Sequence, residues 1–393
     1  MSDEIVVVGM GRTPLGRLQG VLADMTAADL GATAISAAIE RSHVPAESID
    51  ETLMGCVLSA GQGQAPARQA SLAAGIPMTT GCTTINKMCG SAMKSVMLGM
   101  DAIKVGSVNV VAAGGMESMT NAPFLLPKAR AGMRLGHGQI IDHMFLDGLE
   151  DAYDKGRLMG SFAEATASRF EFTREAQDAY AIESLNRANK AIEEGRFKQE
   201  IAPVTVKSPK GETVVDTDEQ PGNARIDKIS QLKPAFAKDG TVTAANSSSI
   251  SDGAAALILM KESEADRRGL TPIARLLAHA TNAHEPAWFT TAPIGAIQKV
   301  METVNWEIDD VDLFEVNEAF AVVTMAVMDQ LELPHDKVNV NGGACALGHP
   351  IGASGARIMV TLIAALQDKG LKRGVASLCI GGGEATAVAL ELI

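Results

Sequence analysis

Short apolar runs rich in β-branched residues alternate with amphipathic helical patterns, and this alternation most constrains how the chain folds. The run "IVVVG" from Ile5 precedes the helical pattern "AADLGATAISAAIERS", and "VNVVAAGG" from Val108 follows another helical stretch. Towards the carboxyl end, "KVNVNGG", a helical pattern and "VASLCIGGGEATAVALELI" repeat the scheme. Apolar strands separated by helices are typical of α/β proteins whose strands are buried on both faces. We therefore expect an α/β fold.

Two segments in different halves of the chain resemble each other. "AAGGMES" (Ala112 to Ser118) aligns with "CIGGGEA" (Cys379 to Ala385), and each is interpreted as a strand that ends in glycines and a glutamate. A duplicated half explains this most simply. Between the halves, the composition changes to a long helical pattern and a polar tract rich in Pro, Gly, Lys and Asp. We expect a first half at 1–120 continued by 248–272, an inserted loop domain at 121–247, and a second half at 273–393.

The net charge limits which kinds of partner the protein is expected to bind. The 393 residues carry a net charge of −13, which argues against a general nucleic-acid surface because such surfaces are basic. Between Arg196 and Asp239 lie eight basic and seven acidic residues, a local +1 that suits either an anionic ligand or a solvated surface. No apolar run reaches membrane-spanning length, so we expect no membrane association.

Cysteine usage and the amino terminus indicate a compartment. Five cysteines, an odd number without a CxxC pair, make a disulfide framework or structural zinc site unexpected. The histidines show no metal-ligand spacing, so no metal is predicted. The chain enters a strand almost at once, without a basic apolar leader, and we expect a cytoplasmic protein.

The amino-terminal glycines do not match the dinucleotide-binding motif. Gly9 and Gly11 follow a strand as in a dinucleotide-binding turn, but the third glycine is misplaced and Pro14 interrupts the turn. There is no Walker A loop and no GxSxG elbow either. The residues themselves therefore predict no nucleotide cofactor.

Cys89 lies where a strand-like run ends and a helical pattern begins, in "TTINKMCGSAMKSVMLGM". A cysteine at a helix amino terminus faces unpaired N–H groups and the positive end of the dipole, which favour the thiolate and lower the pKa. Gly90 removes bulk beside it, so that a substrate can approach. Cys89 is thus a candidate nucleophile, and a small apolar core residue is the alternative.

Three more clusters place reactive side chains in special contexts. His349, between glycines and Pro350, suits a base or an oxyanion donor, although a lone histidine is more often structural. Cys379 ends a strand before three glycines whose N–H groups suit an oxyanion hole, with a buried strand cysteine as the alternative. In "EVNEAF", Asn317 and Glu318 are polar residues among apolar ones and need partners or a role.

These clusters together resemble the thiolase family over nearly the whole chain. The motifs "RTPLG", "GQGQAPARQA", "NKMCGSAMKS", "AGGMESM", "VNEAF", "GGACALGHPIGASGAR" and "LCIGGG" occur in the family's order. The resemblance is greatest to acetyl-CoA acetyltransferases and bacterial 3-ketoacyl-CoA thiolases. It implies two βαβαβαββ halves in a five-layered αβαβα core, with a CoA-binding loop domain inserted in the first half.

The resemblance also implies roles. Cys89 would carry the acyl group as a thioester, and His349 would activate Cys89 and form one oxyanion hole with a water held by Asn317. Cys379 would move the α-proton of acetyl-CoA, and the N–H groups of Cys89 and Gly381 would form a second oxyanion hole. Two thiols and an imidazole supply what a Claisen condensation needs.

The ligand and assembly expectations come from the same resemblance. Ser248 in "NSSSISDG" matches the family's serine that contacts the pantetheine of CoA. CoA and acyl-CoA would be substrates, so no separate cofactor is expected. A homo-oligomer, dimer or tetramer, is implied, with a homotetramer as the leading state, and fatty acid metabolism is the expected context.

Three departures from the family pattern concern acyl-chain fit. Leu158 stands where acetoacetyl-CoA-type thiolases usually have histidine, while Ala92 and Ser249 stand where glycine is common. We expect the latter two to lie near the ligand path. The leading function is an acetyl-CoA C-acyltransferase for acetoacetyl-CoA or short chains. The alternatives are a longer-chain degradative thiolase, a decarboxylating ketoacyl synthase, and a non-catalytic acyl-CoA- or lipid-binding protein.

Overall fold

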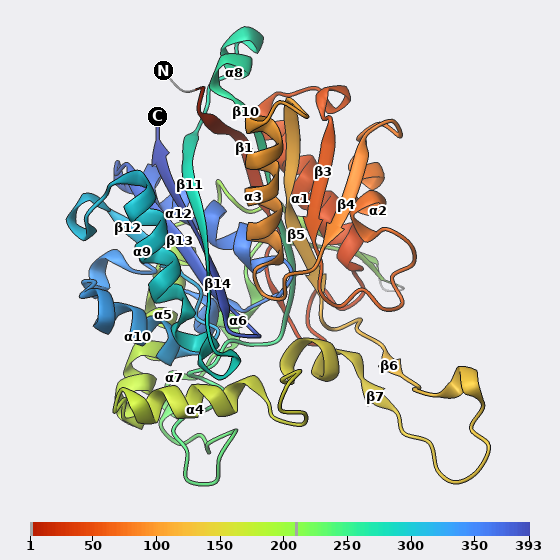
Figure 1. Ribbon diagram of the computed structural model, residues 1–393, viewed down its shortest axis with the longest axis vertical. Coiled ribbons are helices and arrows are strands. Elements are labelled where there is room, and N and C mark those ends of the chain that lie inside the picture. The colour runs from red at the N-terminus through yellow and green to blue at the C-terminus, as the bar shows by residue number, and fades with distance from the viewer. Residues whose placement is uncertain (1–2, 209–210) are drawn as a thin grey trace.

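The computed structural model describes residues 3–208 and 211–393 (Figure 1). Ten strands of this described part join one sheet in the order β12-β13-β14-β11-β1-β10-β5-β3-β4, and β2 pairs with β10. The strands are β1 Ile5–Arg12, β2 Gly16–Arg17, β3 Glu51–Gly55, β4 Gly81–Ile85, β5 Val110–Ser118, β10 Ser251–Lys261, β11 Ala274–Ala283, β12 Leu313–Val316, β13 Arg373–Ile380 and β14 Glu384–Leu392.

The sheet is built from two halves with the same pairing pattern. In the middle, β1 pairs antiparallel with β11. Outward from β1, β10 and β5 pair antiparallel in turn and β5 is parallel to β3. Outward from β11, β14 and β13 pair antiparallel and β13 is parallel to β12. The predicted duplication is therefore confirmed, with β5 and β13 as equivalent strands.

The glycines of the two aligned segments have different structural roles. The expectation that both segments are strands ending in glycines is wrong for "AAGGMES". "AAGGMES" lies wholly inside β5, whereas "CIGGGEA" leaves β13 at Ile380 and turns into β14. A side chain on Gly115 would meet the carbonyl oxygen of Gly352 at 2.1 Å, so this glycine permits close packing. Gly382 and Gly383 have φ of 96° and 89°, so they make the turn.

Helices cover both faces of the sheet and fill the space between its halves. The α-helices are α1 Ala27–Ser42, α2 Pro66–Ala73, α3 Ser91–Lys104, α4 Met159–Arg169, α5 Arg174–Glu193, α6 Glu219–Asn223, α7 Ile226–Ile229, α8 Glu262–Arg268, α9 Ala292–Val304, α10 Ala321–Leu331, α11 Ala344–Leu347 and α12 Ser354–Lys369. Shorter helical turns are η1 Ala46–Ser48, η2 Ala129–Ala131, η3 Phe145–Leu149, η4 Pro286–Thr291, η5 Ile308–Asp310 and η6 His335–Lys337.

The layers follow from which helix packs where. Helices α3 and α12 contact each other and both halves of the sheet, so they form the central layer. Helices α1 and α2 cover the outer face of the first half, and α9 that of the second, beside α10. Helix α12 is buried without a break from Ser354 to Leu366, as its apolar sequence requires. The predicted five-layered αβαβα core is confirmed.

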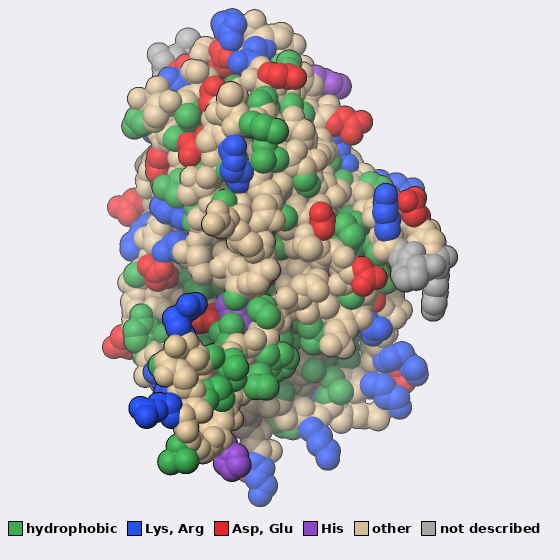
Figure 2. Space-filling view, turned by 90° about the vertical axis from the view of Figure 1, so that its right-hand side faces the viewer, with side chains coloured by type: hydrophobic (Ala, Val, Ile, Leu, Met, Phe, Trp, Pro, Cys, Tyr) green, Lys and Arg blue, Asp and Glu red, His purple; other side chains and the backbone are tan. Residues whose placement is uncertain are grey.

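The segment between β5 and β10 leaves the core and returns. It contains the two-residue strands β6 Phe124–Leu125 and β7 Ile141–Asp142, helices α4 to α7, and the hairpin of β8 Val204–Ser208 and β9 Gly211–Val215. In Figure 1, the chain between β6 and β7 projects from the body as an arm. Figure 2 views the molecule from this side and shows hydrophobic side chains gathered in its lower half. The exact limits of the inserted domain stay a prediction.

A buried ion-pair group ties this inserted segment to the core. Arg12 at the end of β1 is fully buried, with its Nε 2.5 Å from Glu200 and Nη1 2.7 Å from Asp218, and its guanidinium lies over Phe197. Both carboxylates come from the insertion. Losing one partner of such a group costs about 3–5 kcal/mol, because an uncompensated charge stays buried.

The described residues contain neither a membrane-spanning helix nor a metal-binding cluster. None of their helices combines the length and apolarity that crossing a membrane requires. Nor does any group of three or more His, Cys, Asp or Glu side chains among them suit a metal ion.

Candidate active site

Cys89 sits in a short loop between β4 and α3. Ser91 is the first residue of α3 and Gly90 its cap, so Cys89 directly precedes the helix, as predicted. The loop is held locally: the Lys87 N–H donates to Ser91 Oγ at 2.8 Å, and Ser91 Oγ donates to the Met88 carbonyl at 2.6 Å. Met88 adopts a positive φ of 49°. This loop presents the Cys89 thiol next to the β13–β14 turn.

The electrostatic expectation for Cys89 is wrong. Burial raises the pKa of its thiol to about 11, although the backbone N–H groups of Gly381 and of Cys89 itself act in the opposite direction. The thiol packs against two apolar clusters, one of which includes Val57 and Ile351. Exclusion of water therefore outweighs these two N–H groups, because the charged thiolate loses its solvation.

Cys379 and Gly381 approach Cys89 from the second half. Cys379 is the penultimate residue of β13 and is 1% exposed. Burial, followed by the nearby Cys89, raises the pKa of the Cys379 thiol well above its usual value. The two loops touch closely, since a side chain on Gly90 would come within 2.3 Å of Ile380. The structure thus brings both predicted thiols and the Gly381 N–H together.

His349 is held in the loop between α11 and α12. Its backbone N–H donates to the Ser249 carbonyl at 3.1 Å, and its Nδ1 lies 2.6 Å from Ser354 Oγ. Its Nε2 is buried and has no hydrogen-bond partner among the described residues. Burial, reinforced by the positive charge of Arg357, lowers the pKa of His349 to about 3. The imidazole is therefore neutral near pH 7 and has one free nitrogen.

Asn317 follows β12 and lies beside His349. Its Nδ2 is 3.5 Å from His349 Nδ1, and Arg357 Nη2 is 3.5 Å from its Oδ1. Arg357 also contacts Glu315 at 3.2 Å in a buried ion pair. Glu318, which follows Asn317 in the sequence, instead accepts hydrogen bonds from the hydroxyl groups of Tyr180 and Ser184 on α5. Asn317 therefore belongs to the histidine's surroundings, whereas Glu318 docks the inserted helix.

Comparison with known proteins gives this arrangement a family. Residues 5–263 match the family described as thiolase, N-terminal domain, and residues 270–392 match thiolase, C-terminal domain. The chain belongs to the thiolase family. "Acetyl-CoA acetyltransferase" of Thiocystis violacea is 48% identical over 100% of both chains. "Acetyl-CoA acetyltransferase 2" of Arabidopsis thaliana is 48% identical over 99% of this chain and 97% of that protein.

Solved thiolase structures agree with the fold. The Bacillus anthracis acetyl-CoA acetyltransferase has a TM-score of 0.97 at 40% identity, covering 100% of this chain and 99% of the other. The Acat5 thiolase of Ascaris suum, solved with coenzyme A, has a TM-score of 0.94 at 43% identity, covering 99% of this chain and 100% of the other. This thiolase is accordingly an acyltransferase enzyme.

Sequence reasoning missed two residues of this thiolase site. Ser354 bonds the histidine's Nδ1, and Arg357 lies against Asn317 and lowers the histidine's pKa. The sequence contains only one modest indication of these two residues. Arg357 is a lone arginine within the apolar pattern of α12, and a charge there needs a buried partner.

A cavity of about 490 Å³ opens beside the nucleophile loop of the thiolase. Met88, Gly381 and Met159 line it, together with an outer part that includes Asp147 and Tyr153. Of the departures from the family pattern, Leu158 caps α4 next to Met159. Ala92 is not among the residues that line this cavity. It is fully buried in the core against Gly115, because it belongs to the first turn of α3 that packs on β5.

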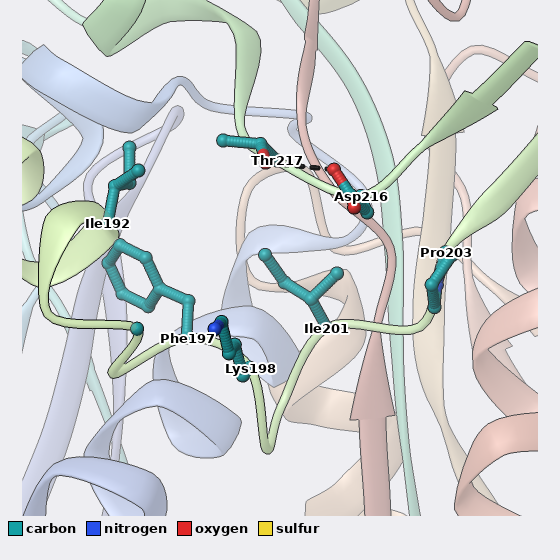
Figure 3. A pocket seen from close by; sticks show the side chains of 8 residues that line it. Ile192, Phe197, Lys198, Ile201, Pro203, Asp216 and Thr217 are labelled. Atoms are coloured by element: carbon teal, nitrogen blue, oxygen red, sulfur yellow. Dashed lines mark hydrogen bonds between the residues drawn. The ribbon is translucent and has the colours of Figure 1, made fainter.

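Two further cavities are lined wholly or mostly by residues of the inserted segment. One of about 330 Å³ is lined by Arg225, Lys228 and Ser249, among others. The predicted CoA contact, Ser248, is not among its lining residues, and its N–H donates to the Ala319 carbonyl at 3.0 Å. The other, about 270 Å³, is shown in Figure 3. It is lined by Ile192, Gly195, Phe197, Lys198, Ile201, Pro203, Asp216 and Thr217, and contains none of the proposed catalytic residues.

Proposed function

We propose that this thiolase interconverts acyl-CoA plus acetyl-CoA with 3-ketoacyl-CoA plus CoA through an acyl thioester on Cys89, with acetoacetyl-CoA or other short chains as substrates. The observation that carries this is the meeting of Cys89, Cys379 and the Gly381 N–H. The names of the full-length relatives support the acetyl transfer. The coenzyme A in the Ascaris suum structure supports the CoA substrate.

In the cleavage direction, the Cys89 sulfur attacks the 3-keto carbonyl carbon while His349 takes the thiol proton. The C2–C3 bond then breaks, the acyl group stays on Cys89, and Cys379 gives its proton to C2 of the leaving enolate. Between the two stages, the proton on His349 passes to the Cys379 thiolate, so that both residues regain their starting forms. CoA then attacks the thioester, His349 takes the CoA thiol proton and gives it to the leaving Cys89 sulfur, and acyl-CoA and free Cys89 result. Condensation reverses these steps.

The electrostatics of the site support these roles. His349 is neutral and its buried Nε2 has no hydrogen-bond partner among the described residues, so this nitrogen is free to take the thiol proton as the sulfur attacks. The backbone N–H groups of Cys89 and Gly381 both face the Cys89 thiol, where an oxyanion would develop. For the second oxyanion hole, the proximity of Asn317 to His349 supports a role for the pair.

For CoA, we propose the cavity lined by Arg225, Lys228 and Ser249 as the entrance. Its two cationic side chains suit the phosphates of CoA, and Ser249 is adjacent to the predicted contact Ser248. Ser249 also accepts the backbone N–H of His349 through its carbonyl, so this cavity borders the catalytic loop. We propose no separate cofactor.

We also propose a homo-oligomer, with a homotetramer as the leading state, in a reducing compartment such as the cytoplasm. The projecting arm supports assembly, because it exposes large apolar side chains such as Phe124, Leu135 and Ile140. Five free cysteines support a reducing environment. A role in fatty acid metabolism follows from the proposed substrates.

The decisive experiment compares Cys89→Ala with Cys82→Ala. The assay follows the CoA-dependent loss of absorbance of the magnesium enolate of acetoacetyl-CoA and of longer 3-ketoacyl-CoAs. We expect Cys89→Ala to lose activity by about 10⁴-fold or more, because it removes the atom that bonds the acyl group. Cys82→Ala, which removes a partly buried thiol on the edge strand β4, should stay within about twofold of wild type.

The same assay separates the alternatives. Highest kcat/KM on long chains would assign a longer-chain degradative thiolase. Condensation that requires malonyl-CoA, without thiolysis, would indicate a ketoacyl synthase. Binding of CoA without turnover at any chain length would make the protein a binding module, and an active Cys89→Ala enzyme would refute the thioester mechanism.

A further inference from the structure

Glu117 is a fully buried carboxylate to which the proposed reaction gives no role. It lies near the end of β5, in the motif "AGGMESM". Its Oε2 accepts the N–H groups of Val57 and Gly352, both at 2.9 Å. Its Oε1 accepts the N–H of Leu58 at 3.1 Å and the thiol of Cys56 at 3.7 Å. One side chain thus satisfies three backbone donors from two distant segments.

These two segments border the catalytic site. Gly352 follows His349 by three residues, in the turn that leads into α12. Val57 and Leu58 follow β3 and form, with Ile351 and others, the apolar cluster against which Cys89 packs. Glu117 therefore joins the histidine loop of the second half to the support beneath the nucleophile in the first half.

The approach of the two segments is close and specific. A side chain on Gly352 would lie 2.4 Å from Glu117 Oε2 and 3.0 Å from the Cα of Cys56. Only glycine allows the loop to reach the carboxylate. In this dry setting, each N–H that loses its acceptor costs about 1–3 kcal/mol, so the loops would shift to find other partners.

We propose that Glu117 is a positioning residue for the thiolase reaction, which holds the His349 loop against the Cys89 support through the N–H groups of Gly352 and Val57. The inference rests on the proposed function, because Glu117 acts through Cys89 and His349. A misplacement of about 1 Å between reacting groups can lower a rate by about 100-fold. Glu117 therefore governs turnover more than substrate binding.

The test is Glu117→Gln in the full-length protein. The amide keeps the shape, but whichever way it turns, its NH₂ faces an N–H donor. We expect kcat for acetoacetyl-CoA thiolysis to fall about 10- to 100-fold, with the KM for CoA within about twofold of wild type. Hydrogen exchange at the peptide containing Gly352 should become faster. Since burial raises the pKa of Glu117 to about 7, the assay belongs near pH 8.5, where its carboxylate is ionised.

Asp252→Asn is the matched control. Asp252 is a buried carboxylate on the neighbouring strand β10 that accepts the N–H of Thr120 at 2.9 Å and its hydroxyl at 2.6 Å. Within the described part of the chain it makes no hydrogen bond to the His349 loop. We expect its kcat to change by less than about threefold. Glu117→Asp keeps the negative charge but has a shorter side chain. Its kcat should lie between those of Glu117→Gln and the wild type.

The possible outcomes distinguish failure of the positioning role of Glu117 from failure of the proposed function. Wild-type kcat in Glu117→Gln, an equal kcat loss in Asp252→Asn, or an increased KM for CoA without a change in kcat would overturn the positioning role. So would failure of both Glu117 variants to fold, since the carboxylate would then serve general stability. A wild-type protein without thiolysis would instead refute the proposed function.

Discussion

At the scale of residues, the site works with groups that are neutral before substrate binds. Burial raises the pKa of Cys89 to about 11 and lowers that of His349 to about 3. In the free protein at neutral pH, both the thiol and the imidazole are therefore uncharged. The proton moves from sulfur to nitrogen only as the carbonyl carbon is attacked, when the oxyanion donors can stabilise the new charge.

The pH dependence of Cys89 alkylation tests this description. The thiolate is the reactive form, so with a pKa raised to about 11 the rate with iodoacetamide should rise about tenfold per pH unit between about pH 7 and pH 10. Because His349 stays neutral above about pH 3, no inflection should occur near pH 6.5. Mass spectrometry of the Cys89 peptide measures the rate, with Cys89→Ala as the blank. A plateau below pH 8 would show a thiolate already formed.

At the scale of elements, the small residues of β5 let the central helical layer reach the sheet. Gly115 lies where a side chain would come within 2.1 Å of the Gly352 carbonyl and 2.6 Å of Ala92. The same strand carries Glu117, two residues on. Close packing and loop positioning are thus properties of one strand. The position of α12, and with it His349, depends on how closely β5 can be approached.

Gly115→Ala should therefore destabilise the fold. The added methyl cannot fit without moving α12 or β5, and such overpacking costs about 1–3 kcal/mol. Gly81→Ala is the control, because this strand glycine of β4 has no atom within 4 Å of the added group and should change stability by less than about 0.5 kcal/mol. Midpoints of urea unfolding measure both. Equal midpoints for the two variants would contradict the packing argument.

At the scale of the molecule, two features extend beyond a single core. The buried group of Arg12, Glu200 and Asp218 locks the inserted segment onto β1. The arm between β6 and β7 does the opposite and carries apolar side chains away from the body (Figure 1). Leu135, which belongs to the chain between β6 and β7, is 99% exposed. Burial of such residues against another copy of the chain would remove their apolar surface from water.

If the arm mediates the proposed homo-oligomer, replacing Leu135 and Ile140 together by serine should reduce its size. Sedimentation velocity should show a smaller species at the same protein concentration, because the apolar contact between copies is weakened. Val105→Ser is the control, since Val105 is 79% exposed but lies on the body after α3. Thiolysis per protomer should change by less than about twofold. An unchanged sedimentation coefficient would exclude the arm from assembly.

The local pattern of the sequence was enough for some of these conclusions. Periodicity indicated an α/β fold, because the spacing of apolar residues reports which face of an element is buried, and the likeness of "AAGGMES" to "CIGGGEA" indicated two similar halves. Chemistry-bearing residues beside glycines indicated the loops of Cys89, His349 and Cys379 before any contact was known. The motif order was sufficient to indicate the thiolase family.

Only the tertiary structure decided how those residues behave. The helix end at Cys89 predicted a lowered pKa, but solvent exclusion by segments from both halves raises it. Glu117 was only part of a motif until the fold brought Gly352 to it across 235 positions of sequence. A sequence states which groups are present and which local backbone they favour. Desolvation and hydrogen bonding are sums over neighbours in space, and those neighbours are chosen by the packing of the whole chain.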